Sequence, residues 1–353
     1  MSESHRCILR SNYGFRFSCD DPVTGAPVRE ALVREAAARL TPLSGGVSSD
    51  IYLVDDGGKR FVVKRALARL KVMENWTANV SRNAAERDYI ECVGEFLPQA
   101  VPRVLFENPQ AGYFGMEYLD EGFVNWKTIL LQGECKPAHA QMAGNILGEI
   151  HRQTARREDL RKRFDTTANF RELRTSPYLL TTARKNPEFL HLFTAEIERL
   201  EGTRECLVHG DFSPKNVLIR GDRMVLLDCE VAWYGDPAFD IAFLLNHFFL
   251  KGLYHAPRRL ALFKMVDVFW RSYESAGQSG DCQLELRVTR LLPMLLLSRV
   301  DGKSPVEYLD SARKEFVRGF VREQMRSDSG RLDFLAGRWF SQIEQLQPVL
   351  ANS

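Results

Sequence analysis

The strongest constraint on the fold is a change in the pattern of apolar residues near residue 118. Before this point, short runs rich in β-branched and aromatic residues alternate with small-residue turns, which predicts strands within 43–54, 60–64 and 101–119. After it, apolar residues recur with the period of an α-helix, beginning with 137–157. A strand-rich segment followed by a longer helical one predicts an α+β fold with two lobes and a shared site in the cleft between them.

The boundary between the two parts is expected at residues 116–120. We expect a first domain over 1–118, in which a helical extension over about 1–40 precedes the strands, and a second domain over 119–353. The second domain is mainly helical. The few strands predicted there are 206–208, 217–219 and 224–227.

Composition excludes several classes of protein. The 353 residues include 48 Lys and Arg against 46 Asp and Glu, too even a balance for a nucleic-acid or anionic-membrane binder. No apolar run approaches the roughly 18–20 residues of a membrane span, and the first residues lack the apolar core of a signal peptide. The seven cysteines are scattered without a CxxC pair, which argues against a disulfide framework or a structural zinc site. We therefore expect a cytoplasmic protein that binds neither nucleic acid nor a membrane; its oligomeric state stays open.

The residues with the clearest chemistry lie in LVHGDFSPKNVLIRGDRMVLLDCEVAWYGDPAFD, residues 207–240. Asn216 comes five positions after Asp211 (216 − 211), and Asp228 comes seventeen positions after it (228 − 211), at the end of an apolar strand. Phosphoryl transfer needs a carboxylate that accepts the proton of the attacking hydroxyl, and hard oxygen ligands for Mg²⁺. A single such Asp is usually a turn or capping residue, but chance produces the joint spacing much less often.

The first domain offers groups that suit a nucleotide. Lys64 ends a Val-Val strand, where its ammonium could reach the α- and β-phosphates, and Glu86 follows 22 residues later (86 − 64) in a helix predicted over 83–97. The turn that precedes them lets backbone N–H groups or hydroxyls approach phosphates; its residues are Ser44, Gly45, Gly46, Val47, Ser48 and Ser49. The turn matches neither GxGxxG nor a P-loop. The turn, Lys64 and Glu86 therefore indicate a nucleotide site only through their order in the sequence relative to Asp211.

These motifs resemble those of the aminoglycoside phosphotransferase and choline kinase-like superfamily, which has a protein-kinase-like bilobal fold. LVHGDFSPKNVLI is similar to the catalytic loop of that family, and VLLDCEVAWYGDPAFDIA is similar to its metal-binding strand and the following segment. MEYLDEG, 116–122, is similar to its hinge, and the resemblance covers roughly 40–250. There is also some similarity to methylthioribose kinases at EVAWYGDPAFDIAFLLNHFF. The resemblance implies a small antiparallel-sheet N-terminal lobe that binds ATP, and a larger, mainly helical lobe that holds the catalytic residues and the acceptor.

The resemblance implies an ATP- and Mg²⁺-dependent kinase that transfers the γ-phosphate to a hydroxyl of a small molecule, such as a sugar or an amino alcohol. In the first domain, Lys64 would hold the phosphates, Glu86 would orient Lys64, and the small-residue turn would approach the nucleotide. The backbone around Glu117 and Leu119 would contact adenine.

In the second domain, the resemblance implies that Asp211 is the catalytic base and that Asn216 and Asp228 are the magnesium ligands. His209 and Asp240 would support the catalytic loop. Lys215 departs from the small residue common in the family, and it is either a phosphate contact or a solvated lysine. His151 is expected in a core or at a helix end.

The sequence also bears on three other functions. A protein kinase needs an activation segment of some 20–30 residues, but Gly235-Asp236-Pro237 and Asp240 follow Asp228 within twelve positions (240 − 228). A nucleotide-binding module without activity would be expected to lack at least one of four residues, and the chain has all of them: Lys64, Asp211, Asn216 and Asp228. An aminoglycoside-modifying enzyme should gather carboxylates in its C-terminal half, yet 241–353 contains 16 Lys and Arg against 12 Asp and Glu. Arg299, after LLPMLLLS, either faces the acceptor or is a helix-end arginine favoured by the dipole.

Overall fold

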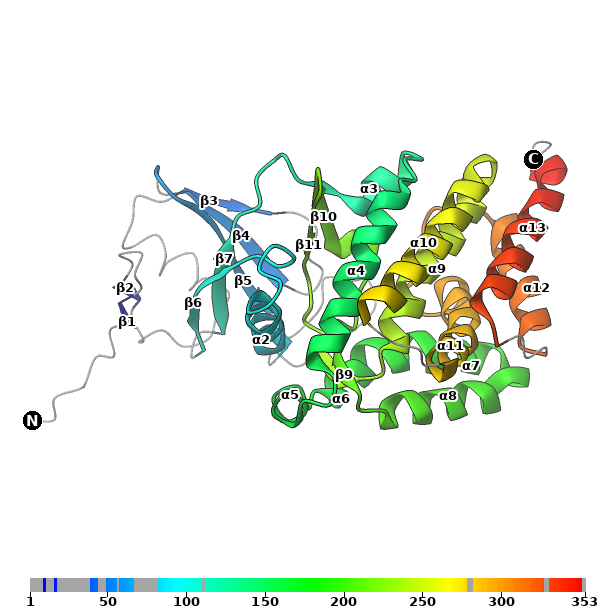
Figure 1. Cartoon of the computed structure of the whole chain (residues 1–353), viewed down its shortest axis with the longest axis horizontal. Coiled ribbons are helices and arrows are strands. Elements are labelled where there is room, and N and C mark those ends of the chain that lie inside the picture. Colours follow the sequence, from blue (N-terminus) through cyan, green and yellow to red (C-terminus); the bar gives the residue numbers. More distant parts are fainter. Residues whose placement is uncertain are drawn as a thin grey trace, which may run out of the picture. The chain divides into compact units, whose positions relative to one another are not determined.

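The structure is a computed structural model that divides into two compact units, Met1–Asp120 and Glu121–Ser353 (Figure 1). The residues that the structure describes are 9–10, 16–17, 39–43, 49–55, 57–66, 82–109, 112–277, 282–326 and 330–350.

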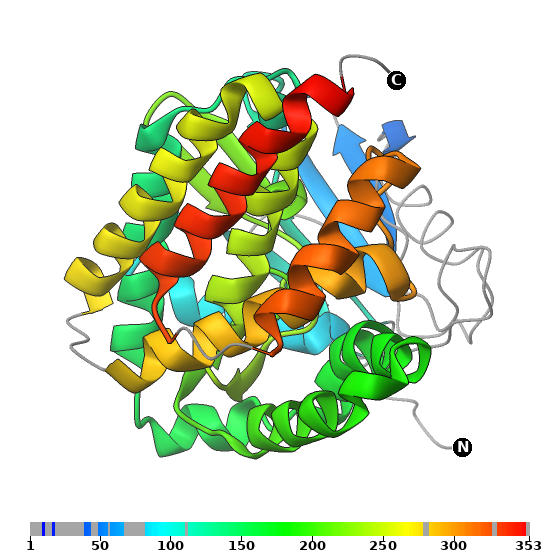
Figure 2. The ribbon, with the colours of Figure 1, turned by 90° about the vertical axis from the view of Figure 1, so that its right-hand side faces the viewer.

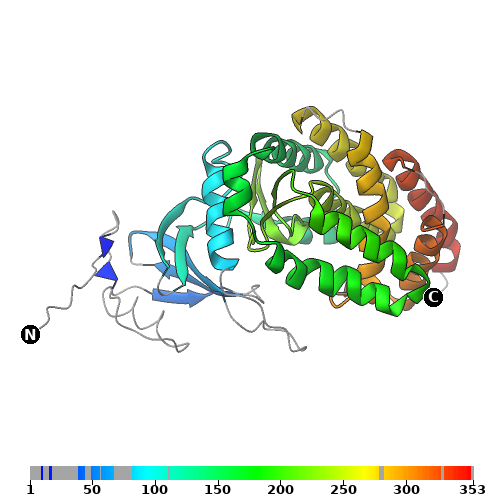
Figure 3. The same ribbon diagram turned by 90° about the horizontal axis from the view of Figure 1, so that it is seen from below.

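Unit 1 is built on a five-stranded antiparallel sheet with the strand order β3-β4-β5-β7-β6. Its strands are β3 (Arg39–Pro42), β4 (Ser49–Asp55), β5 (Arg60–Ala66), β6 (Val104–Asn108) and β7 (Tyr113–Glu117), and a separate pair consists of β1 (Leu9–Arg10) and β2 (Arg16–Phe17). Val54, Phe61, Val63 and Tyr113 form a hydrophobic core on the sheet. Helix α2 (Arg82–Gly94) packs against β5, β6 and β7, and Figure 3 shows it in cyan beside the sheet. The small antiparallel sheet predicted for the N-terminal lobe is therefore confirmed.

The chain enters this sheet earlier than the sequence predicted. Arg39 and Leu40 were expected at the end of a helix, but they belong to β3, which pairs with β4 at the edge of the sheet. Pro42 suits this place, because an edge strand can accept a residue that has no N–H to donate. Pairing with β4 thus overrides the helix propensity of the preceding segment. β1 and β2 also lie within the region expected to be helical, while the remainder of the predicted helix lies outside the described residues.

Unit 2 is mainly helical, as predicted. Its principal helices are α3 (Trp126–Leu131), α4 (Pro137–Thr154), α5 (Glu158–Arg163), α6 (Thr167–Phe170), the π-helix η1 (Arg171–Leu180), α7 (Thr181–Lys185), α8 (Leu190–Gly202), α9 (Ala238–Tyr254), α10 (Arg259–Gly277), α11 (Cys282–Asp301), α12 (Ser311–Gln324) and α13 (Leu332–Leu350). Short 3₁₀ turns are η2 (Pro187–Phe189), η3 (Pro214–Asn216) and η4 (Ala256–Arg258). Its strands are β8 (Val124–Asn125), β9 (Cys206–Val208), β10 (Val217–Arg220), β11 (Arg223–Leu226) and β12 (Trp233–Gly235), which form two small sheets ordered β11-β10-β8 and β12-β9.

Helix α9 is the centre of this unit. Nearly all of its side chains are buried, and α10, α11 and α13 pack around it (Figure 2). Helices α4 and α10 approach closely because Gly144 and Gly148 have no side chain. A Cβ at Gly144 would lie 2.5 Å from Phe269 O, and one at Gly148 would lie 2.6 Å from Tyr273 O. Within the described part of the chain, no helix is both long enough and apolar enough to span a membrane.

Candidate active site

Lys64 and Glu86 are in direct contact within unit 1. Phe61 and Val63 on β5 face the hydrophobic core, so Lys64, one residue further on, points to the opposite face of the strand. There Lys64 Nζ lies 2.8 Å from Glu86 Oε1 on α2, and the side chains are only 1% and 2% exposed. Desolvation offsets most of the attraction in such a buried pair, but removal of one partner leaves a buried charge without compensation.

Of the other nucleotide contacts predicted in unit 1, the structure describes Ser49, Glu117 and Leu119. Ser49 begins β4 and is buried, and its Oγ has no hydrogen-bond partner among the described residues. The other residues of the predicted turn, Ser44, Gly45, Gly46 and Ser48, lie outside the described residues. Glu117 ends β7 and its backbone N–H donates to Arg103 O at 2.8 Å, while Leu119 follows after the strand.

In unit 2, Asp240 fixes the loop that carries Asp211. Strand β9 ends at Val208, and the next two backbone N–H groups donate to Asp240: His209 N to Oδ2 at 2.7 Å and Gly210 N to Oδ1 at 2.9 Å. Asp211 N donates to His209 Nδ1 at 3.2 Å. The predicted supporting roles of His209 and Asp240 are confirmed by these contacts.

Gly210 is the residue that lets the loop turn here. Its φ of +74° lies in the left-handed region, and a Cβ at this position would lie 2.4 Å from Val231 O. A side chain would therefore meet both backbone strain and a backbone clash. Glycine at this position lets the loop present Asp211 three positions after the end of β9 (211 − 208).

Asp211 is buried and is held ionised by two cations. Its Oδ2 lies 2.9 Å from Arg174 Nη2 and 3.0 Å from Lys215 Nζ. Burial alone would raise the pKa of Asp211, but the positive charges of Arg174 and Lys215 outweigh it and hold the pKa below its ordinary value. Asp211 Oδ1 is buried and has no hydrogen-bond partner among the described residues. A buried carboxylate oxygen without a partner is suited to receive a donor from a bound molecule.

Arg174 is a site residue that the sequence interpretation missed. It lies on the π-helix η1, and besides its contact with Asp211 it donates from Nε to Gly210 O at 2.6 Å. The signal that could have indicated it is Pro177, because a proline within an otherwise helical pattern marks an irregular turn. Turns of π-helix occur often at functional sites.

The structure links Asn216 to the chain just before Asp228. Asn216 ends the turn η3, its Nδ2 donates to Asp211 O at 3.0 Å, and its carbonyl oxygen accepts from Leu227 N at 2.8 Å. Asp228 has a φ of +56°, which is uncommon for a residue other than glycine and is found mostly at functional sites and turns. These contacts bring the segments of Asp211, Asn216 and Asp228 together. An amide oxygen and a carboxylate are ligand types that Mg²⁺ prefers, so the donor set fits that ion.

Two further residues from the sequence interpretation have defined places. His151 is buried on α4, where Nδ1 lies 3.0 Å from Tyr273 OH and Nε2 lies 3.6 Å from Asp240 Oδ2, so the prediction of a core histidine is confirmed. Arg299 lies two residues before the end of α11 and donates from Nη1 to Ser304 O at 2.5 Å and to Tyr178 OH at 3.3 Å. It therefore holds the segment after the helix as well as contacting η1.

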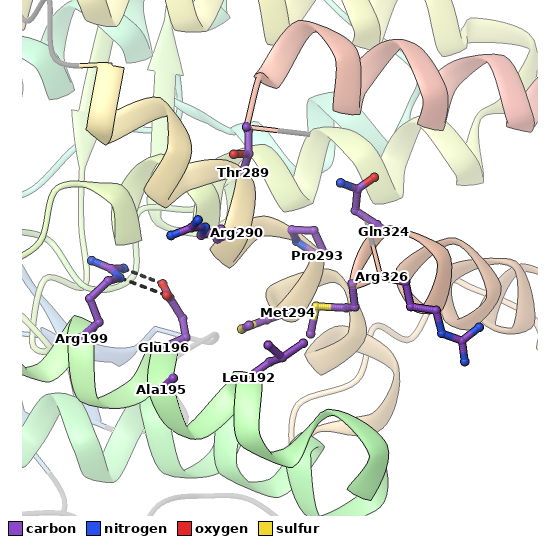
Figure 4. Close-up of a pocket in the computed structure, with 12 residues that line it drawn as sticks. Leu192, Ala195, Glu196, Arg199, Thr289, Arg290, Pro293, Met294, Gln324 and Arg326 are labelled. Atoms are coloured by element: carbon purple, nitrogen blue, oxygen red, sulfur yellow. Dashed lines mark hydrogen bonds and ion pairs between the residues drawn. The ribbon is translucent and has the colours of Figure 1, made fainter. Parts of the chain in front are cut away.

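A separate hollow of about 460 Å³ lies between α8, α11 and the end of α12 (Figure 4). Glu196 and Arg199 form an ion pair on its wall, and Arg199 also contacts Asp236. None of the predicted site residues lines it.

Comparisons with known proteins agree with this geometry. The model of the phosphotransferase enzyme family (APH) matches residues 39–260. A methylthioribose kinase from Geobacillus kaustophilus is 23% identical over 282 residues, which cover 70% of this chain and 70% of that protein. An aminoglycoside phosphotransferase from Alicyclobacillus acidocaldarius superposes with a TM-score of 0.52 at 16% identity, over 93% of this chain and 98% of that chain. An amicoumacin kinase superposes with a TM-score of 0.50 at 15% identity, over 83% of this chain and 90% of that chain.

These similarities confirm the resemblance and the protein-kinase-like bilobal α+β fold that it implied. Because the family model spans more than half of its length, the chain belongs to the phosphotransferase enzyme family and is a small-molecule kinase.

Proposed function

We propose that the protein transfers the γ-phosphate of ATP to a hydroxyl group of a small molecule, in a Mg²⁺-dependent reaction with Asp211 as the base. The observation that carries this proposal is the state of the Asp211 carboxylate. Its Oδ2 is occupied by Arg174 and Lys215, whereas Oδ1 has no partner within the described part of the chain. An acceptor hydroxyl that donates to Oδ1 would complete the hydrogen bonding of the carboxylate.

The lowered pKa of Asp211 suits this kind of reaction. The transferred phosphoryl group passes through a loose transition state in most analyses, so orientation of the attacking hydroxyl matters more than early removal of its proton. An ionised carboxylate can orient the hydroxyl and take its proton late in the transfer. The bonds that Asp240 makes to the loop keep this carboxylate in one place, which favours a fixed line of attack.

Asn216 and Asp228 are proposed as the residues that hold magnesium. When bound, Mg²⁺ would neutralise charge on the nucleotide phosphates. The hydrogen bond from Leu227 N to Asn216 O supports a shared role, because it ties the residue before Asp228 to the second ligand. Asn216 Nδ2 donates to Asp211 O, which leaves its amide oxygen for the metal.

Unit 1 is proposed to bind the nucleotide. Lys64 would contact the phosphates from its pair with Glu86, and Ser49 and the turn before it would approach them. Because the Glu117 N–H is already bonded to Arg103 O, an adenine contact there would use the Glu117 carbonyl, with the Leu119 backbone beside it. ATP use is also supported by the amicoumacin kinase, which was solved in complex with AMP-PNP.

Release of ADP tests this proposal. The protein is incubated with ATP and a panel of sugars, sugar thioethers, sugar acids, amino alcohols and aminoglycosides, with Mg²⁺ and then with EDTA. At least one hydroxyl acceptor is expected to raise ADP release above the acceptor-free rate, and EDTA is expected to abolish the increase. An acceptor-stimulated rate that persists without a divalent cation would contradict the proposal. The homologous methylthioribose kinases make methylthioribose one member of the panel.

A further inference from the structure

One face of α9 leads from the catalytic loop to a group of positively charged side chains. Asp240, Phe243, His247 and Lys251 follow one another at steps of three or four residues, so they share this face. Asp240 binds the loop. The ring centroid of Phe243 lies 5.7 Å from the guanidinium carbon of Arg174, the partner of Asp211, and Lys251 comes eight positions after Phe243 (251 − 243), about 12 Å further along the axis.

Lys251 is buried without a carboxylate. The residue is 1% exposed, and its Nζ lies 5.2 Å from the ring centroid of Tyr308. Within the residues that the structure describes, no Asp or Glu pairs with it. Burial, together with the positive charges of Arg299 and Lys127, lowers the pKa of Lys251 to about 7. An ammonium group in such a place is stabilised when an anion binds beside it.

Arg299 is a second cation near Lys251, and it is linked to Asp211 through Tyr178 and Arg174. Its guanidinium carbon lies 5.8 Å from the ring centroid of Tyr178, and that of Arg174, the partner of Asp211, lies 5.8 Å from the same ring. Arg299 donates to Tyr178 OH and to Ser304, but to no carboxylate among the described residues. Both guanidinium groups thus lie against the ring of Tyr178, and Arg174 connects this ring to Asp211, the proposed base.

Three polar atoms in this group are buried and lack a hydrogen-bond partner among the described residues. They are His247 Nδ1, Arg299 Nε and Tyr308 OH. Buried polar groups are nearly always hydrogen-bonded in folded proteins, so several orphaned atoms close together indicate a ligand. Burial, and then the charge of Lys251, keeps the pKa of His247 well below its ordinary value, so His247 is neutral and able to donate.

The charges of the group do not balance. Lys127 is paired with Glu307 at 2.5 Å, and Arg174 and Lys215 share the single carboxylate of Asp211. Arg299, and Lys251 when it is protonated, then add positive charge that no carboxylate of the described residues pairs with. We propose that the acceptor carries an anionic group, a carboxylate or a phosphate, that binds Lys251 and Arg299 while its hydroxyl meets Asp211.

This inference rests on the proposed function, because it names the substrate class of the same site. An anionic acceptor also extends the expectation from the residue count that the acceptor is not a polycationic aminoglycoside. The phosphoryl group that is transferred is a second anion that could bind Lys251 and Arg299. The test therefore occupies the nucleotide site with AMP-PNP before the acceptor is added. Arg299 also holds the segment after α11 through Ser304, and Lys251 is therefore the better residue to change.

Calorimetric titration provides the test. Wild-type protein with AMP-PNP and Mg²⁺ is titrated with two matched pairs, ribose 5-phosphate against ribose and gluconate against glucitol. At least one anionic member is expected to bind at least tenfold more tightly than its neutral counterpart. Lys251→Met, which removes the charge but keeps the length of the side chain, is expected to lose this preference. Lys162→Met, a change of an exposed lysine on α5, is the matched control and should keep it.

Three outcomes would overturn the inference. Equal affinity for both members of each pair would show that no anionic group is recognised, and an unchanged preference in Lys251→Met would show that Lys251 does not recognise it. Inorganic phosphate that binds the wild type only when AMP-PNP is absent would assign the cations to the transferring phosphoryl group. The ADP-release assay tests the proposed function independently: a preference for anions without acceptor-stimulated ADP release would contradict that function alone.

Discussion

Arg174 Nη2 lies 2.9 Å from Asp211 Oδ2, and the same guanidinium donates through Nε to the carbonyl oxygen of Gly210. One side chain from the π-helix therefore positions the loop and sets the charge of its carboxylate. Arg174 acts on the reaction through Asp211 and is a positioning residue. Its removal should change the pH dependence of catalysis as well as its rate.

We expect Arg174→Gln to move the acid limb of the kcat/KM profile to higher pH. Arg174 lowers the pKa of Asp211, so its loss raises that pKa, and the active ionised form is then lost at a higher pH. An arginine beside an aspartate typically lowers the pKa by about 1–3 units, and Lys215 remains, so a shift of about one unit is expected. Arg171→Gln, on the exposed side of the same helix, should leave the limb in place. A loss of rate without any shift of the limb would mean that Arg174 has only a structural role.

Gly210→Ala should destabilise the protein much more than Gly221→Ala. Both glycines have positive φ, +74° and +59°, but the new Cβ at Gly210 would lie 2.4 Å from Val231 O, whereas nothing lies within 4 Å of a Cβ at Gly221. Both variants bear a left-handed strain of about 1–2 kcal/mol, and only Gly210→Ala adds the clash. Urea unfolding of the two variants measures the difference. Equal losses would show that the loop can relax away from Val231.

Lys64→Ala should reduce kcat/KM severely, and Lys64→Arg should not restore it, because a planar guanidinium differs in donor geometry from an ammonium. Glu86→Gln should be milder, since it disturbs only the position of Lys64. Removal of one member of a buried pair typically costs about 3–5 kcal/mol, so unfolding must be measured beside the rate. Lys59→Ala changes an exposed lysine of the same unit and is the control. Equal losses of rate in Glu86→Gln and Lys64→Ala would give Glu86 a role of its own.

Lys251→Met should stabilise the protein, and more so at pH 6 than at pH 9. The pKa of Lys251 is about 7 in the folded protein, below its ordinary value, so the native state binds fewer protons than the unfolded state above that pH. The wild type therefore gains stability as the pH rises from about 7 towards the ordinary pKa, and below about 7 it bears the full cost of the buried charge. Arg299 and Lys127 add to that cost, and Glu307 and Cys135 oppose it. Urea unfolding at the two pH values measures the effect, and a constant difference between variant and wild type would contradict it.

Spacing predicted the contacts that lie close in sequence. His209, Asp211 and Asn216 stand within eight positions, so one loop explains their proximity. The pair of Lys64 and Glu86 could be inferred from their order, because a strand followed by a helix that packs on it brings them together.

Contacts across long separations could not be predicted in this way. Arg174 meets Asp211 through an irregular helix, and no periodicity indicates which residue such a helix presents. Lys251 stands near the end of an apolar helix, where a lysine usually reaches solvent, and only the packing of α9 shows that it is buried. The strand Arg39–Pro42 was predicted incorrectly because its pairing with β4 is not visible in local propensity.

The central claim, that Asp211 is the base, is tested most directly by the single-turnover rate of Asp211→Asn with the best acceptor from the panel. We expect the rate to fall about 10²–10⁴-fold. Titration of ATP with Mg²⁺ should give nearly the wild-type affinity, because the base acts on the acceptor hydroxyl. Asp222→Asn, an exposed aspartate on the nearby turn between β10 and β11, should keep the wild-type rate. If Asp211→Asn retains more than about a tenth of the wild-type rate, the shortfall from the expected general-base effect would contradict the assignment.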